Sequence, residues 1–120
     1  MPGYSTSTTV GSQRTINHTN AGGSSFAALY LPPVRAKVES IQLTNLTGGA
    51  LPVSIKVVPR TSTDFAADGF YVCSEARVAG GETLSPVKSG IIVEVTEQLV
   101  LQSPVASSIE AVITSTEGVI

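Results

Sequence analysis

The sequence predicts an all-β protein, an antiparallel β-sandwich of about seven to eight short strands preceded by an extended N-terminal arm. Three observations predict this class. From residue 25 onward, apolar residues recur with a period of two rather than 3.6. Turn-forming pairs such as Gly48-Gly49 and Asp68-Gly69 separate these stretches, and the strand candidates follow one another at a spacing of roughly 8–12 residues. The stretches are rich in β-branched residues, and no window has a sustained helical repeat. Jelly-roll connections are compatible with this order.

The first two strand candidates of the sandwich differ in how clearly they alternate. Residues 25–31 alternate weakly and stop at Pro32-Pro33, because proline cannot donate to a strand ladder. The next candidate, Val34–Asn45, alternates well, but its phase slips by one residue at Glu39-Ser40. Such a slip predicts a β-bulge or a bend. Gly48-Gly49 then predicts a turn into the following strand.

The remaining strand candidates follow in order to the end of the chain. In the stretch after the Gly-Gly turn we expect Val53, Ile55 and Val57 to face the core, with Ser54 and Lys56 on the opposite face. A polar loop over residues 60–69 comes next. The further strand candidates are residues 70–78, 82–87, 90–96, 98–103 and 107–120.

The stretch VAGGETLS, residues 78–85, has the glycines of a ligand loop or of a plain turn. A phosphate-binding loop would need glycines that lead into a helix, usually with a lysine for the charge. Here Gly80-Gly81 lead into residues of β character, and Pro86 disfavours a helix. We therefore expect a strand that ends at Val78, a glycine corner and a new strand that opens at Thr83-Leu84.

Residues 1–24 are predicted to form an arm, and residues 25–120 the sandwich domain. Sixteen of the first 25 residues are Ser, Thr, Asn or Gly, too polar a composition to order itself by burial. Extended at ~3.3 Å per residue, the arm would reach roughly 80 Å, whereas a domain of this size has a radius of gyration of only roughly 13 Å. It could lie along its own domain, but we favour a neighbouring subunit. The candidate partner-binding residues are Tyr4, Val10, Arg14 and Ile16.

Composition and charge exclude several functions. Charged residues make up only 13% of the chain, about half the usual share, so little charge needs desolvation when this surface contacts protein. The net charge is −2 and no basic stripe exists, which argues against nucleic-acid binding. The N-terminus lacks a signal peptide and the chain lacks a membrane-spanning apolar run, so we expect no membrane partner and synthesis in the cytoplasm. The single cysteine, Cys73, is interpreted as a small buried residue.

No catalytic or metal-binding constellation is visible. His18 is the only histidine and lies in the arm, so a Ser-His-Asp triad has no plausible base. Asp64 and Asp68 share a polar loop, but their spacing matches no calcium loop. Glu94 and Glu97 are close in sequence on β structure, where carboxylates mostly face solvent rather than form a glycosidase pair. We therefore expect neither an enzyme, nor a cofactor, nor a metal.

The order of strand and turn signals over about residues 34–120 resembles that of small β-sandwich virion proteins of tailed bacteriophages. The family pattern has a strand that ends in Asn, a glycine turn, an alternating strand, a Gly-x-x-Leu corner and three further strands. The matching segments here are Ile41–Asn45, Gly48-Gly49, Val53–Val58, Ala79–Leu84, Gly90–Val93, Leu99–Leu101 and Ile109–Ile113. These are turn and strand signals and carry no chemistry, so the resemblance implies a structural role.

The resemblance implies a capsid decoration or cement protein of a bacteriophage virion. Such a protein would bind the major capsid protein or other virion subunits, and we expect a homo-oligomer, with a trimer favoured. A neck, head-tail connector or tail accessory protein is the alternative within the structural class. A carbohydrate-binding module is the alternative from another class. It would need exposed aromatic side chains, and Tyr30 and Tyr71 are the candidates in a chain with no tryptophan.

Overall fold

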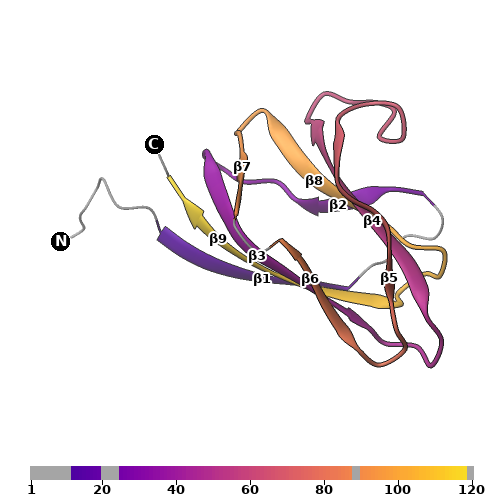
Figure 1. Cartoon of the computed structure of the whole chain (residues 1–120). Helices are drawn as coiled ribbons and strands as arrows, with labels where there is room; N and C mark the ends of the chain where they lie inside the picture. Colours follow the sequence, from indigo (N-terminus) through magenta and orange to yellow (C-terminus); the bar gives the residue numbers. More distant parts are fainter. Residues whose placement is uncertain (1–11, 20–24, 88–89, 119–120) are drawn as a thin grey trace.

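The computed structural model describes residues 12–19, 25–87 and 90–118. These residues form nine strands in two antiparallel sheets, and they include no helix (Figure 1). No helix long and apolar enough to cross a membrane occurs in the described part of the chain. The prediction of an all-β sandwich is confirmed. The strands are β1 Ser12–Thr19, β2 Ala27–Tyr30, β3 Ala36–Asn45, β4 Leu51–Pro59, β5 Phe70–Val78, β6 Thr83–Val87, β7 Ile91–Val93, β8 Glu97–Gln102 and β9 Ile109–Glu117.

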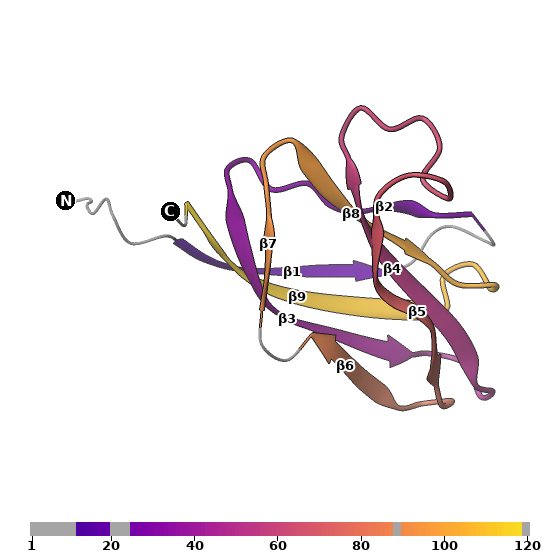
Figure 2. The same cartoon turned by 45° about the horizontal axis from the view of Figure 1, so that its top comes forward.

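The strand order is that of a jelly roll. The first sheet runs β1-β9-β3-β6, with β7 also paired to β3, and the second runs β2-β8-β4-β5 (Figure 2). Early strands pair antiparallel with late ones, β1 with β9, β2 with β8, β3 with β6 and β7, and β4 with β5. Such nested pairing results when one long antiparallel hairpin folds over to form two packed sheets. One side of the sandwich therefore ends in β1 and β2, and the other side ends in β6 and β5.

The core lies between the two sheets and is built from the alternate residues of each strand. Val53, Ile55 and Val57 face it from β4, as the alternation predicts. Tyr30 of β2 is 3% exposed, and its hydroxyl reaches across to Ser115 Oγ on β9 at 2.9 Å. A buried phenol needs such a partner, so this contact fixes one sheet against the other.

Two local irregularities predicted from the sequence are present. The pairing of β3 with β9 shifts register between Val38 and Ser40, where the apolar phase slips. Both Ile41 and Leu43 thereby remain in the core after the bulge. The VAGGETLS stretch also behaves as predicted, because β5 ends at Val78 and β6 begins at Thr83.

Asn45 joins the corners at this end of the sandwich and is fully buried. Its side-chain amide donates to the carbonyls of Gly49 and Val78, at 2.8 and 2.9 Å. Its Oδ1 accepts from the backbone N–H and the hydroxyl of Thr47. Its backbone pairs with the glycine corner, through Gly81 N–H to Asn45 O at 3.0 Å. A buried amide that satisfies so many partners specifies the positions of three chain segments.

One strand, β1, lies in the segment that is predicted to form the arm. Ser12–Thr19 forms β1 and pairs with β9 over its whole length, from Ser12 opposite Glu117 to Thr19 opposite Glu110. Hydrophobic alternation does not reveal this strand, because Ile16 is its only large apolar residue. Backbone pairing to β9 rather than side-chain burial therefore accounts for its place in the sheet.

Candidate interaction surface

The structure describes only part of the predicted partner-binding set. Tyr4 and Val10 lie outside the described residues. Arg14 lies within β1, in a part of the strand whose side chains are not described. Ile16 is half-buried and packs against the chain's own core. The four residues therefore remain a predicted partner-binding set, of which the structure describes one side chain, that of Ile16.

The more distinctive surface is the outer face of the second sheet, because residues 60–69 fold over it. This loop connects β4 to β5. Val58 and Val100 point away from the core between the sheets and are nevertheless buried. Gly69 packs against the same face, where an added Cβ would lie 2.0 Å from the carbonyl oxygen of Val57. The loop thus covers a second, smaller apolar layer.

Lys56 of β4 anchors the loop of residues 60–69 to the sheet and is only 3% exposed. Its Nζ donates to the backbone carbonyls of Phe65 and Ala66, at 2.9 and 3.0 Å. The same atom lies 5.0 Å from the ring centroid of Tyr71 and 5.6 Å from that of Phe26. Two carbonyls and two ring faces compensate for the water that the ammonium group gives up. The sequence alternation places Lys56 correctly on the outer face, but that face is buried.

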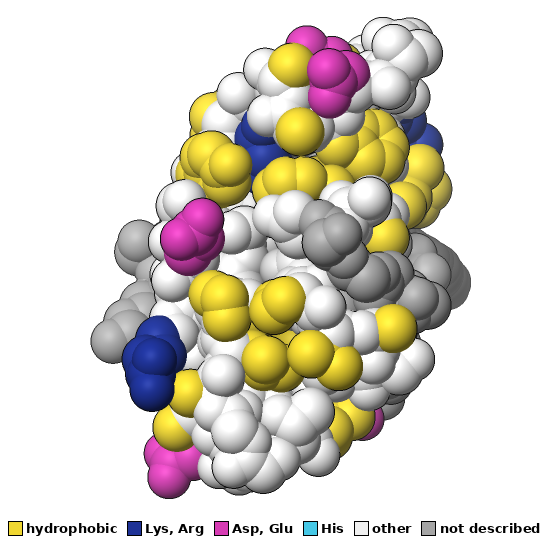
Figure 3. All heavy atoms as spheres, turned by 90° about the vertical axis from the view of Figure 1, so that its right-hand side faces the viewer, with side chains coloured by type: hydrophobic (Ala, Val, Ile, Leu, Met, Phe, Trp, Pro, Cys, Tyr) yellow, Lys and Arg dark blue, Asp and Glu magenta, His cyan; other side chains and the backbone are white. Residues whose placement is uncertain are grey.

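All three phenylalanines of the chain gather at this end of the second sheet. The ring of Phe26, just before β2, lies 6.4 Å from that of Tyr71 on β5. Phe65 belongs to the loop. Phe70 and Tyr71 begin the edge strand β5 and are 58% and 51% exposed. Figure 3 shows hydrophobic side chains around a basic one at this end of the molecule, with acidic side chains at the rim.

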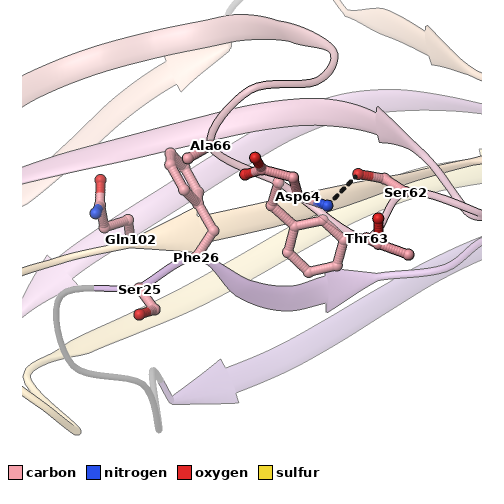
Figure 4. Close-up of a pocket in the computed structure, with 8 residues that line it drawn as sticks. Ser25, Phe26, Ser62, Thr63, Asp64, Ala66 and Gln102 are labelled. Atoms are coloured by element: carbon pink, nitrogen blue, oxygen red, sulfur yellow. Dashed lines mark hydrogen bonds between the residues drawn. The ribbon is translucent and has the colours of Figure 1, made fainter.

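A pocket of about 410 Å³ opens beside this cluster. Residues 62–66 form one wall, and Ser25, Phe26 and Gln102 line the other side. Figure 4 shows Ser62, Thr63 and Asp64 facing this second group across the hollow. The lining therefore combines two phenyl rings with hydroxyl, carboxylate and amide groups.

A second hollow of about 230 Å³ adjoins the first at Gln102. Its lining includes Ser54 and Glu75, which meet where the backbone N–H of Glu75 donates to Ser54 Oγ at 2.8 Å. Glu75 has a φ of 50°, which is unusual for a residue other than glycine. The β4–β5 register shifts at this point, so Glu75 marks a bulge in the edge strand.

The carboxylates considered as catalytic or metal-binding candidates form hydrogen bonds and an ion pair with nearby groups. Glu97 Oε1 accepts the backbone N–H of Glu94 at 3.0 Å, and Glu94 forms an ion pair with Arg35 at 3.1 Å. Asp68 accepts from the hydroxyl of Ser62, and Asp64 accepts the N–H of Ala67. Within residues 12–19, 25–87 and 90–118, no group of three or more His, Cys, Asp or Glu residues is placed to hold a metal ion. The side chain of His18 is not described.

Cys73 lies half-buried on β5. Its thiol donates to the carbonyl of Val53 at 3.7 Å. Burial raises the pKa of this thiol above its ordinary value. The thiol therefore stays protonated near neutral pH, where only the thiolate would be a good nucleophile.

Local sequence patterns do not reveal this surface, because its residues come from segments far apart in the chain. Phe26, Phe65 and Tyr71 meet only when the long hairpin folds over. One signal was present: every phenylalanine lies next to a turn or a strand end. A second was the lysine in the strand VSIKVV, whose other residues are apolar except for Ser54, because such a side chain needs carbonyl or aromatic partners when buried.

No protein-family model and no curated protein matches the chain. Among solved structures, the chain is similar to one from Bacillus endospore appendages, described as a novel family of disulfide-linked pili. The TM-score is 0.51 and the identity 18%, and the match covers 99% of this chain and 100% of that chain. It is also similar to a chain of infectious bursal disease virus, Gx strain, with a TM-score of 0.47 and 9% identity over 92% of this chain and 32% of that chain. The first likeness shows a shared fold.

Proposed function

We propose that the chain is a structural subunit that joins a larger protein assembly through the edges of its sandwich. The observation that carries the proposal is the β5 edge. β5 ends its sheet, and no described strand pairs with its outer side. Its first two residues, Phe70 and Tyr71, expose more than half of their side chains. An open strand edge beside exposed aromatic side chains is a template for pairing with another chain.

The opposite side of the sandwich supports the same function. β1 ends the other sheet on that side, and its outer edge also pairs with no described strand. At the β5 side, β6 is blunted by Pro86, which cannot donate to an added strand. One copy could therefore place its β1 side against the β5 side of the next copy. Such head-to-tail contacts form rings when they close and filaments when they do not.

Two kinds of assembly fit this design. The resemblance in strand and turn signals favours a tailed-phage virion, where the chain would decorate the capsid shell as a trimer on the major capsid protein. A neck or tail accessory position is the alternative in the same particle. The full-length likeness to a subunit of spore appendages favours a second candidate, a filament built from copies of this chain.

Covalent linkage of the kind named for the spore appendages does not fit these 120 residues. Each internal subunit of a disulfide-linked filament needs at least two cysteines, one for each neighbour. This sequence has one, Cys73, whose thiol is half-buried. We therefore propose contacts made by strand edges and side chains rather than by disulfide bonds.

We predict that Phe70→Lys weakens association of the subunits by at least about tenfold, because a lysine at the edge would have to be desolvated in the interface. Sedimentation and electron microscopy of the purified chain would measure this, with reductant present. Val105→Lys, a change at an exposed apolar residue in the loop between β8 and β9, is the control and should leave association unchanged.

The same experiment separates the two candidates. Filaments or rings of the purified chain alone would support self-assembly. A chain that stays monomeric or trimeric, yet binds shells of the particle that contains it, would support the decoration role. A chain that does neither, or equal association of both lysine variants and the wild type, would overturn the proposal.

The arm has its own test, for which β1 must be kept. Deleting residues 1–24 would also remove Ser12–Thr19 and expose the edge of β9. We predict that a variant lacking only residues 1–11 keeps the melting temperature of the full chain but binds its assembly partner less tightly. Calorimetry and co-sedimentation with the assembled particle would measure the two properties. Equal occupancy of both forms on the particle would show that the first eleven residues have no role in binding.

A further inference from the structure

We propose that the pocket between the loop 62–66 and Phe26 is a binding site for a neutral saccharide. The site adjoins the proposed assembly edge, because the ring of Phe26 lies 6.4 Å from that of Tyr71 on β5, but binding of a sugar does not require the chain to assemble. Its wall belongs to a loop mounted on a rigid sandwich, which is where binding sites commonly occur. Its volume of about 410 Å³ falls within the range of small-molecule sites.

The charges around the pocket disfavour ionic ligands of either sign. Asp64 lines the pocket and would repel an anion, and no lysine or arginine is among the lining residues. A cation would be attracted by Asp64 but would also approach a group of like charge. The buried ammonium group of Lys56 already lies 5.6 Å from the Phe26 ring, so that a second positive charge at this ring would be repelled. A neutral ligand avoids both penalties.

The lining groups match the two kinds of surface that a sugar presents. The rings of Phe26 and Phe65 can cover the apolar C–H face of a sugar. The polar groups can bind its hydroxyls. Thr63 is exposed and its hydroxyl makes no hydrogen bond to the described residues, and the bonds of the Asp64 carboxylate to those residues use only Oδ1. Hydroxyl groups of the ligand would form hydrogen bonds with the Thr63 hydroxyl and with the Asp64 carboxylate.

The loop wall is held in place before any ligand binds. Lys56 fixes the carbonyls of Phe65 and Ala66, and Ser62 Oγ donates to Asp68 at 2.8 Å. The carbonyl of Asp64 accepts the N–H of Asp68 at 3.0 Å. A wall that is already ordered loses little conformational entropy on binding, which favours affinity for a small ligand.

This site differs from the carbohydrate surface that the sequence alone suggested. Tyr30 faces the core and bonds to Ser115, so it cannot stack on a sugar. Tyr71 remains exposed but is not among the residues that line the pocket. The aromatic surface in the pocket therefore comes from Phe26 and Phe65 and not from the two tyrosines.

The test is a binding screen of the full chain against named probes. The probes are glucose, galactose and N-acetylglucosamine with their short oligomers, together with sialylated and sulfated sugars and an oligolysine peptide. We expect at least one neutral probe to bind, with NMR shifts at the amides of Phe26, Thr63 and Asp64. Binding by none of the neutral probes at millimolar concentration overturns the proposal, and so does binding of only the charged ones.

Two variants then localise the site by titration with the free, monovalent sugar. Thr63→Val should lower the affinity roughly 2- to 10-fold, because one hydrogen bond is lost without a change of shape. Phe26→Ala should lower it by at least about tenfold. Val105→Ala, in the loop between β8 and β9, should not change it. Melting temperatures check that each variant is folded, and unchanged affinity in both pocket variants would refute the site even if sugar binds.

Discussion

Asn45→Ala should lower the free energy of unfolding by about 3–5 kcal/mol, a large part of the stability of a domain of this size. The substitution leaves the carbonyls of Gly49 and Val78 without their donor. It also removes the acceptor for the N–H and the hydroxyl of Thr47. Each buried group that loses its partner costs about 1–3 kcal/mol.

Denaturant unfolding of the purified chain would measure the loss, with two variants for comparison. Thr47→Val removes one hydroxyl and spares the amide, so its effect should stay near 1 kcal/mol. Asn45→Asp keeps the size and the acceptor but removes both N–H donors, and it should destabilise about as much as alanine does, because it also places a charge in a fully buried position. A loss below about 1 kcal/mol for Asn45→Ala would contradict the role assigned to this amide.

The corner that Asn45 stabilises also positions the proposed assembly surface. Its amide ties the turn after β3 to the end of β5, and its backbone carbonyl binds Gly81 at the start of β6. The C-terminal end of the edge strand β5 is therefore fixed at this corner. We expect Asn45 variants that remain folded to weaken assembly as well, since the two features share one strand.

Local sequence patterns predicted much of the sandwich. The phase slip at Glu39-Ser40 and the glycines at 48–49 and 80–81 act through neighbouring residues, and each is found where predicted. The nesting of the strands is not local. It depends on which distant strands pair, and many short alternating strands of similar composition fit several orders.

Hydrophobic alternation predicts neither the strand β1 nor the burial of Lys56. β1 pairs through its backbone, which every residue except proline can do, so the polar sequence SQRTINHT carries no signal for it. The burial of Lys56 depends on a loop that returns over the outer face of β4. Period-two alternation assigns a side chain to a face, but it does not say whether another segment covers that face.

Gly69 offers the sharpest test of how that loop is packed, because Gly81 provides a matched control. Both glycines have a positive φ, 75° and 74°. An added Cβ at Gly81 meets nothing within 4 Å, whereas at Gly69 it would lie 2.0 Å from Val57 O and 2.8 Å from Val58 Cγ1. Alanine at either position carries the same left-handed backbone penalty, about 1–2 kcal/mol. Only Gly69→Ala must also push the loop away from the sheet.

We therefore predict that Gly81→Ala destabilises by about 1–2 kcal/mol and Gly69→Ala by at least about 2 kcal/mol more. The additional loss arises because the backbone of β4 cannot yield as a flexible side chain would. Denaturant unfolding measures both values. Hydrogen exchange should locate the extra effect in the loop, with faster exchange at the amides of Ala67 and Asp68, which bond to the carbonyl of Asp64. Equal losses for the two variants would mean that the loop lies loosely on the sheet and that Lys56 alone holds it.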